Sequence, residues 1–418
     1  MIVLFLYNIS LSVYNFGIHF FSFFNSKAKK FIRGRQNWQN NIENSLKANE
    51  KRIWIHCAST GEYEQAKPII EALYVKYTEY KIVITFFSPS GYEAQKQNHK
   101  NGYVFYLPID RKKNAEYFIS IIKPSLVLFI KYEFWYYYLN ELKKNKIPTL
   151  LISTAFRREQ PFFKWYGRFF RQMLSCFTCF FVQDTESSQL LKEIGFDKNV
   201  ILSGDTRYDR VTNIAIQTKN IPIIERFKGK NKLLIGGSTW PDDENMLYNC
   251  KNILPSNWKM IIAPHEFGNG HIDKILKLFG NEAILYSSIT ETINFTDIKI
   301  LIIDNMGMLS SIYYYCDIAF VGGGFLKGGI HNILEPAVYG LPIFFGPNYK
   351  KFVEANALVA ENFAFPIHNA IEFNKKLELF LIDEPKLIEL HECLKEFMQQ
   401  KIGATKIIIE YINEYFLL

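Results

Sequence analysis

The stretch from Gly322 to Pro347, GGGFLKGGIHNILEPAVYGLPIFFGP, decides the fold class of this chain. It follows the apolar run IAFV and leads into a second apolar run that begins at Leu341. Glycines directly after a strand let the backbone approach a ligand, and amides at the next helix start favour an anion. Glu335, at that predicted helix start, is placed to accept hydrogen bonds from sugar hydroxyls. The same letters also fit a plain turn in any parallel sheet.

Apolar runs alternate with helical segments on both sides of this stretch. In the first half the runs are Arg52–His56, Lys81–Phe87, Leu126–Ile130, Thr149–Ser153, Phe180–Gln183 and Val200–Leu202. In the second half they are LLIGGS, MIIAPHE, KILIIDN, DIAFVGGG and LPIFFGP. This alternation predicts an α/β fold with two doubly wound, Rossmann-like domains that face a cleft, with ligands at the carboxyl ends of the strands.

The length of 418 residues also favours more than one domain. A polar stretch rich in Lys and Asn separates the two series of strands. We therefore predict an N-terminal membrane anchor at 1–26, an α/β domain at 27–212, a linker at 213–232, a second α/β domain at 233–384, and a C-terminal helical segment at 385–418 that packs back on the body.

The N-terminal stretch has the composition of a membrane anchor. No Lys, Arg, Asp or Glu occurs between Met1 and Ser26. A basic cluster follows at once, made of Lys27, Lys29, Lys30, Arg33 and Arg35. A spanning helix needs about 20 mainly apolar residues, and a basic flank tends to stay in the cytoplasm. Because Asn8, Ser10, Ser12, Asn15 and His19 weaken the span, the anchor is expected to be spanning or interfacial, with a buried helix as the alternative.

The composition of the chain limits the kinds of binding partner that are expected. The net charge of +8 comes without a basic block interleaved with aromatic residues, so no nucleic-acid partner is indicated. A modest positive charge suits an anionic membrane surface. Cys176 and Cys179 have the spacing of a zinc-binding pair, but no second pair accompanies them. Free thiols in a reducing compartment are therefore expected, with no metal site.

The clearest candidate for catalysis in the first half is Glu62. A strand ends at His56, a turn carries Ser59-Thr60-Gly61, and Glu62 opens a helix. A carboxylate at a helix N-terminus is stabilised as an anion, which favours a simple cap on spacing alone. Facing a cleft, the same carboxylate can instead accept a proton from an attacking hydroxyl.

In the second half, polar residues follow several strands. Ser238 precedes an acidic stretch, where it either caps a helix whose amides hold a phosphate or belongs to a plain capping box. His265 follows MIIAP, where it contacts a base or phosphate or is structural. Met306-Gly307-Met308 follows KILII. Because such loops gather at one sheet edge, together they favour a shared ligand site.

The motifs in order resemble the 3-deoxy-D-manno-octulosonic acid (Kdo) transferases of Gram-negative bacteria. They are STGE, SPSGYE, YLPID, KYEFW, FVQDTES, GDTRYD, APHE, DNMGM and GGGFLKGGIHNILEP. The resemblance implies the two-domain GT-B architecture and transfer of Kdo from CMP-Kdo to the lipid A precursor, lipid IVA. It places that step at the cytoplasmic face of the inner membrane, early in lipopolysaccharide core assembly, with inversion and without a metal or other cofactor.

The resemblance also implies the site. Glu62, in the family's S-x-G-E motif, is the expected general base, and the first domain is expected to bind the acceptor. The residues expected to bind CMP-Kdo are Pro264, His265, Met306, Gly307, Met308, Asn332, Ile333, Leu334, Glu335, Arg207 and Ser238. Met308 stands where relatives commonly carry Glu, so a side-chain contact there would be lost. Arg207 replaces a common Lys and retains the cation.

Two other classes remain open. A different GT-B glycosyltransferase that uses a UDP- or GDP-sugar would share the glycine-rich turn and Glu335. It would not be expected to share STGE, SPSGYE and KYEFW. An inactive sugar-binding or scaffold protein would be expected to lack the base, whereas Glu62 is present.

Overall fold

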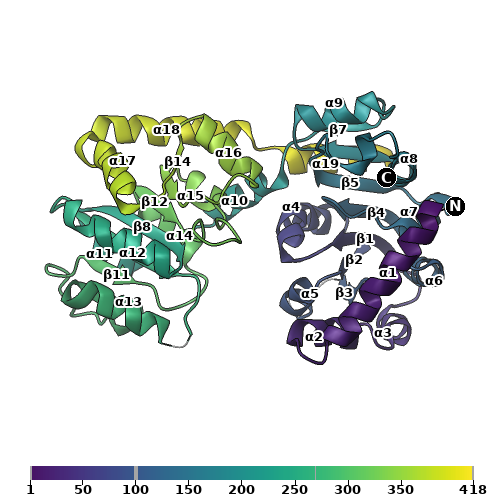
Figure 1. The fold of residues 1–418 in the computed structure, drawn as a ribbon, viewed down its shortest axis with the longest axis horizontal. Helices are drawn as coiled ribbons and strands as arrows, with labels where there is room; N and C mark the ends of the chain where they lie inside the picture. The colour runs from purple at the N-terminus through teal and green to yellow at the C-terminus, as the bar shows by residue number, and fades with distance from the viewer. Residues whose placement is uncertain (1, 98–101, 269, 417–418) are drawn as a thin grey trace. The chain divides into compact units, whose positions relative to one another are not determined.

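The computed structural model describes residues 2–97, 102–268 and 270–416, and the chain divides into two compact units (Figure 1). Unit 1 runs to Arg210 and resumes at Ile402, and unit 2 comprises Val211–Lys401. Each unit has its own parallel sheet, with helices on both faces, and its own hydrophobic cores. The two doubly wound sheets predicted from the alternation of strands and helices are confirmed.

The sheet of unit 1 has seven strands in the order β3-β2-β1-β4-β5-β6-β7. Its strands are β1 (Lys51–Cys57), β2 (Tyr80–Phe86), β3 (Gly102–Tyr106), β4 (Pro124–Ile130), β5 (Thr149–Thr154), β6 (Cys179–Val182) and β7 (Val200–Leu202). The strand order reverses direction between β1 and β4, which is the switch point where open α/β sheets bind ligands.

The strands of unit 1 are buried on both faces, as parallel strands require. Successive residues of β1 alternate between two cores, with Trp54 in one core and Ile53 and Ile55 in the other. The helices around them are α1 (Ile2–Phe21), α2 (Ser26–Arg33), α3 (Trp38–Ser45), α4 (Thr60–Lys76), α5 (Pro89–Gln95), α6 (Lys112–Ile122), α7 (Tyr136–Lys144), α8 (Arg168–Leu174), α9 (Thr185–Glu193) and α19 (Ala404–Tyr415), with a 3-10 turn at Pro161–Phe163.

The sheet of unit 2 also has seven strands, in the order β10-β11-β9-β8-β12-β13-β14. They are β8 (Lys232–Thr239), β9 (Trp258–Pro264), β10 (Ala283–Leu285), β11 (Ile300–Ile302), β12 (Ile318–Val321), β13 (Ile343–Phe345) and β14 (Ala364–Pro366). The helices are α11 (Pro222–Lys228), α12 (Pro241–Cys250), α13 (His271–Phe279), α14 (Leu309–Ile312), α15 (Leu334–Ala337), α16 (Val353–Ala360), α17 (Ala370–Ile382) and α18 (Glu384–Gln400). Short 3-10 turns lie at Lys251–Ile253, Gly280–Glu282, Tyr286–Ser288 and Tyr313–Tyr315.

The structure divides the chain at different residues from those expected. Residues 213–232, expected to be a linker, contain the end of α10 (Thr206–Ile216) and all of α11. The C-terminal segment is shared, because α18 belongs to unit 2 and α19 to unit 1. Asp209 of α10 joins the two segments of unit 1 near the points where the chain leaves that unit and returns to it. Its carboxylate accepts hydrogen bonds from the Gly403 and Thr405 amides at 2.7 and 2.6 Å.

The N-terminal helix α1 is long and apolar enough to cross a membrane, by length and composition. None of its described residues is buried. It lies against unit 1, extending from the region of α7 to α2 (Figure 1).

Candidate active site

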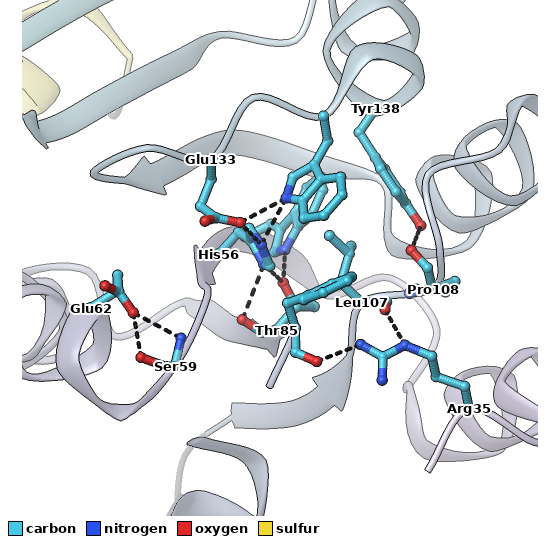
Figure 2. A network of polar contacts seen from close by, with 12 residues as sticks. Arg35, His56, Ser59, Glu62, Thr85, Leu107, Pro108, Glu133 and Tyr138 are labelled. Carbon is cyan, nitrogen blue, oxygen red and sulfur yellow. Dashed lines mark hydrogen bonds and ion pairs between the residues drawn. The ribbon is translucent and has the colours of Figure 1, made fainter. Parts of the chain in front are cut away.

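Glu62 lies at the start of α4, directly after the carboxyl end of β1, and closes a capping box with Ser59. Its Oε2 accepts hydrogen bonds from the Ser59 amide at 2.9 Å and from the Ser59 hydroxyl at 2.6 Å (Figure 2). The side chain is half-buried. The capping role favoured by the spacing is therefore confirmed, and the helix terminus holds the carboxylate in one orientation as an anion.

A second carboxylate, Glu133, lies at the carboxyl end of β4. Its Oε2 is 2.9 Å from His56 Nε2 and accepts a hydrogen bond from Trp135 Nε1 at 2.7 Å (Figure 2). On the other side of the imidazole, His56 Nδ1 is 2.8 Å from the Thr85 hydroxyl, which itself accepts from Trp54 Nε1 at 2.8 Å.

These contacts orient both the imidazole and the carboxylate. Since Trp54 donates to the Thr85 oxygen, the Thr85 hydroxyl proton can point to His56 Nδ1. A neutral His56 then donates from Nε2 to Glu133. His56 and Thr85 are fully buried, so Glu133 is held by groups that cannot exchange their partner for water.

Glu62 and Glu133 belong to one edge of the sheet. Burial, together with the negative charges of both carboxylates, raises the pKa of the Cys57 thiol at the end of β1. The two carboxylates follow β1 and β4, the paired strands on either side of the switch point. Sequence reasoning used Glu133 only as part of KYEFW and gave it no role. Its place after a strand was the available signal, and the left-handed backbone of Lys131 (φ 65°) turns the chain just before it.

Arg207 lies in unit 1, at the start of α10. Its Nε and Nη2 bind Asp205 Oδ2 at 2.9 and 2.7 Å, and Gln65 donates to the other carboxylate oxygen at 3.1 Å. Although burial alone would raise it, the paired Arg207 holds the pKa of Asp205 below its usual value. Arg207 thus belongs to the edge that carries Glu62, and not to unit 2, which carries the other residues expected to bind CMP-Kdo.

In unit 2 the glycine-rich turn serves close packing of backbone segments. A Cβ at Gly324 would lie 2.4 Å from the Gly346 nitrogen, and one at Gly322 would lie 2.2 Å from the Ser238 carbonyl oxygen. The Gly322 amide donates to the Gly237 carbonyl at 2.9 Å, and the Gly323 amide donates to Asp243 at 2.8 Å. Two of the three amides expected to hold an anion are therefore occupied within the protein.

Asp243 fastens this turn to the start of α12. Its Oδ2 accepts from the Gly323 amide and, at 3.0 Å, from the Trp240 amide. Burial raises the pKa of Asp243 to about 6, while these two amides oppose the shift. Helix α12 begins at Pro241, so Ser238 lies within β8 and does not cap the helix. Ser238 instead has a left-handed backbone (φ 53°), a strained conformation that is common at ligand-contact positions.

An aromatic stack lies at the carboxyl ends of β8 and β9. The Trp240 and His265 rings are 5.1 Å apart, and those of His265 and His331 are 4.2 Å apart. Trp240 Nε1 donates to His331 Nε2 at 3.0 Å. Burial and the neighbouring His265 lower the pKa of His331 to about 4, so the ring is neutral near pH 7. The convergence of strand-end residues expected from the sequence is found here for His265.

The sequence pointed to His265 but missed Trp240 and His331. The sequence did contain an indication for both residues. Trp240 directly follows the strand LLIGGST, and His331 lies within the glycine-rich stretch. Stacked aromatic rings beside a glycine turn offer a flat face, which is the type of surface on which nucleotide bases stack.

The remaining predicted residues of unit 2 divide into exposed and buried groups. Asn332 Nδ2 donates to Glu335 Oε1 at 3.0 Å, and Glu335 is the second residue of α15, as expected. Met306 is exposed and Gly307 has a positive φ of 86°. Pro264, Ile333 and Leu334 are buried, and Met308 is half-buried. Pro264, Ile333 and Leu334 can therefore contribute to a ligand site mainly through their backbone.

Comparison with known proteins agrees with this geometry. Residues 31–210 match the model of a protein family described as 3-deoxy-D-manno-octulosonic-acid transferase (kdotransferase). That segment contains Glu62, Glu133 and Arg207.

Curated relatives extend the similarity over most of the chain. A Haemophilus influenzae 3-deoxy-D-manno-octulosonic acid transferase is 25% identical, with 87% of each chain covered. The Aquifex aeolicus protein of the same name is 27% identical over 85% of this chain and 96% of that relative. A Fusobacterium nucleatum bifunctional glycosyltransferase/methyltransferase is 26% identical over 85% of this chain, which spans only 56% of that longer protein.

Solved structures place the fold among GT-B proteins. UDP-GlcNAc 2-epimerase from Neisseria meningitidis superposes with a TM-score of 0.61 at 16% identity, covering 87% of this chain and all of that one (100%). A calicheamicin glycosyltransferase superposes with a TM-score of 0.57 at 11% identity, covering 88% of this chain and 99% of the other. At this identity the likeness concerns the fold alone.

Proposed function

This chain belongs to the Kdo transferase family and is a glycosyltransferase, and on that premise we propose that it transfers Kdo from CMP-Kdo to lipid IVA. We assign the acceptor to unit 1 and the CMP-Kdo donor to unit 2. We place the reaction at the cytoplasmic face of the inner membrane, where this precursor of the lipopolysaccharide core would be met. The observation that carries the proposal is the pair of held carboxylates at the switch point of unit 1.

Glu62 is the proposed general base. The attacking hydroxyl of the acceptor glucosamine gives its proton to the Glu62 carboxylate as its oxygen bonds to the anomeric carbon of Kdo. CMP leaves from the opposite side with the bond's electron pair, so the configuration inverts. Ser59 supports this role because its two hydrogen bonds fix the position of Glu62 Oε2.

Unit 2 supports the donor assignment. We propose that the cytosine base lies near the stacked rings of His265 and His331, and that Glu335, oriented by Asn332, accepts the ribose hydroxyls. Pro264, Ile333, Leu334 and the Met306–Met308 loop complete the proposed nucleotide contacts. Ser238, with its strained backbone next to Gly237, is the proposed contact for the phosphate. Because these are protein dipoles and side chains, the transfer we propose needs no metal.

A donor-competition assay tests the function. The full chain is incubated with lipid IVA in detergent and with CMP-Kdo, a UDP-sugar or a GDP-sugar. The masses of the products are then measured by mass spectrometry. We expect lipid IVA to gain the mass of Kdo, with CMP released only in the CMP-Kdo reaction. A gain from a UDP- or GDP-sugar would favour a different GT-B glycosyltransferase. No product from any donor would favour an inactive sugar-binding protein.

A further inference from the structure

Helix α1 has two unlike sides. Its half-buried residues recur every three or four positions and face the body of unit 1: Leu4, Tyr7, Asn8, Leu11, Asn15 and Ile18. Its exposed residues include a second row that is almost wholly apolar: Ile2, Phe5, Leu6, Ile9, Val13, Phe16 and Phe20. A helix that must face lipid all round has no reason to keep its polar residues on one side.

The inward side is fastened to unit 1 by specific polar contacts. Tyr7 Oη donates to Asp110 Oδ2 at 2.5 Å, and Tyr137 Oη donates to Asn8 Oδ1 at 2.8 Å. Asp110 is fully buried and also accepts from the Tyr137 and Tyr138 amides at 3.0 and 3.1 Å at the start of α7. Asp110 therefore connects α1 to α7.

These contacts are incompatible with a helix that leaves the body and crosses a bilayer. Moving α1 into lipid would break the Tyr7–Asp110 and Tyr137–Asn8 hydrogen bonds. It would also carry the Tyr7 hydroxyl and the Asn8 and Asn15 amides into a medium without hydrogen-bond partners, which is costly. Asn8, one of the polar residues that make α1 a weak span, is thus also a residue that docks it on unit 1.

The outward side has the chemistry of a membrane surface. After α1 the chain exposes Phe23 and Phe24, 82% and 81% accessible. Lys27, Lys29, Lys30 and Arg33 on α2 are also exposed. Arg35 differs, because it turns inward, stacks on Phe31 and donates to the Phe87 carbonyl at 2.7 Å. An apolar helix face next to exposed lysines is the pattern of a helix that lies in an anionic interface.

We propose that α1 lies flat in the headgroup region of an anionic phospholipid bilayer, with its outward apolar row in the membrane and its inward row docked on unit 1. The helix does not span the bilayer. This inference rests on the proposed function, because the proposed lipid acceptor is the reason why the protein would need to bind a membrane.

The docked helix also lies next to the candidate active site. The Tyr14 ring on α1 is 6.1 Å from that of Phe87, and Phe87 is 4.7 Å from Trp135. Trp135 in turn donates to Glu133. These contacts connect α1 to the strand-end edge of unit 1. If α1 lies flat in the membrane, the edge that carries Glu133 is therefore held at the membrane surface.

Spin-label depth measurements test the orientation. Single cysteines replace Phe5, Ile9 and Phe20 in turn in the full chain with Cys393→Ser, because Cys393 is the exposed native thiol among the described residues. The labelled proteins are bound to vesicles of phosphatidylcholine and phosphatidylglycerol. We expect equal, shallow depths at all three positions. A maximum at Ile9 would show a spanning helix, a steady gradient would show tilted insertion, and water exposure at all three would show no insertion, and each of these overturns the proposal.

A matched pair of variants tests the surface itself. Phe16→Asp with Phe20→Asp places charge on the outward row, whereas Val75→Asp changes an equally exposed apolar residue on α4. Removing two buried aromatic rings from the interface should weaken vesicle binding by at least about tenfold. Val75→Asp should leave binding unchanged. Equal binding by all three proteins overturns the proposal. Self-association that the double variant abolishes, without vesicle binding, would assign the surface to a second copy.

Transfer activity separates this inference from the proposed function. The double variant should still act on acceptor dispersed in detergent, because its substitutions lie on the outer face of α1. If the chain binds vesicles as described but transfers no Kdo, the function fails and the orientation stands. If it transfers Kdo but α1 spans, the orientation fails and the function stands.

Discussion

The strand-end edges of the two units are built from different chemical groups. In unit 1 the edge carries charged side chains held by other side chains, as Glu133 is held by the buried His56 and the buried Asp205 by Arg207. In unit 2 the edge includes a glycine-rich backbone turn and stacked aromatic rings, with Gly324 packed against Gly346 and His331 stacked on His265. One fold thus provides two surfaces, and this difference supports our proposal that proton transfer takes place in unit 1 and nucleotide binding in unit 2.

Both units use a buried aspartate to hold this edge together. Asp110 connects α1 and α7 in unit 1, and Asp243 connects the glycine turn to α12 in unit 2. Burial raises the pKa of each carboxyl to about 6. The comparison shows that a raised pKa here accompanies a structural role in each unit, since both carboxylates accept backbone hydrogen bonds that join separate segments.

The largest effect should come from the base. Glu62→Gln should lower transfer by roughly 10²-fold or more, the usual scale for loss of a general base, while CMP binding stays unchanged. Steady-state rates with CMP-Kdo and lipid IVA measure this. Glu71→Gln, an exposed position on the same helix, is the matched control and should keep full activity.

Glu133→Gln tests whether Glu62 or Glu133, at the same edge of the sheet, is the general base. If Glu62 alone takes the proton, the Glu133 variant should lose less activity and keep the pH profile of the native enzyme. An acidic limb that disappears in Glu133→Gln but remains in Glu62→Gln would identify Glu133 as the base. Glu62 would then be only the helix cap that its bonds to Ser59 already make it.

The next effect concerns the nucleotide. Glu335→Ala should remove charge-assisted hydrogen bonds worth about 1.5–3 kcal/mol, so that CMP binds roughly ten- to a hundredfold more weakly. Titration calorimetry with CMP measures the change. Glu378→Ala on the exposed side of α17 is the control. Unchanged CMP affinity in Glu335→Ala would place the ribose elsewhere.

Glycine substitutions test the claim that unit 2 uses backbone packing. Gly324→Ala puts a methyl group 2.4 Å from the Gly346 nitrogen, and such overpacking should cost about 1–3 kcal/mol of the free energy of unfolding. Gly328→Ala, in the same stretch, meets nothing within 4 Å and should be near neutral. Denaturant titrations of both variants provide the comparison. Equal stabilities would show that the turn adapts to a side chain.

The last effect is a pH dependence of the free energy of unfolding. Because the pKa of Asp243 is raised to about 6, the native state holds its proton more tightly than the unfolded chain does. Its contribution to stability is full below the unfolded pKa near 4 and is lost as pH rises through 6. The loss should amount to roughly 2–3 kcal/mol. Asp243→Asn should remove this part of the pH dependence of unfolding, whereas its exposed neighbour changed by Asp242→Asn should not.

Much of the fold followed from periodicity. Apolar runs such as Lys81–Phe87 and Leu126–Ile130 fell within one or two residues of β2 and β4, because strands buried on both faces leave little room for polar residues. The strands β3, β10 and β14, which lie at sheet edges, were not predicted. The boundary at Lys401 was also missed, because it depends on where α19 packs.

The positions of the candidate site residues were predicted in part. Glu62 and His265 follow strands, as expected, because the chain position alone gives that information; their roles remain predictions. Trp240, His331 and Glu133 were not given roles, because their partners are far away in sequence. His56 and Glu133 are 77 positions apart, and Trp240 and His331 are 91 positions apart.

By itself, the sequence determined the two α/β units, the polar loops at the strand ends and the apolar N-terminal helix, since each depends on residues close together in the chain. Tertiary structure decided which of these loops meet, which amides of the glycine turn are already occupied, and which side of α1 faces the body. These depend on contacts such as Tyr7 with Asp110, 103 positions apart, which only the folded chain brings within hydrogen-bonding distance.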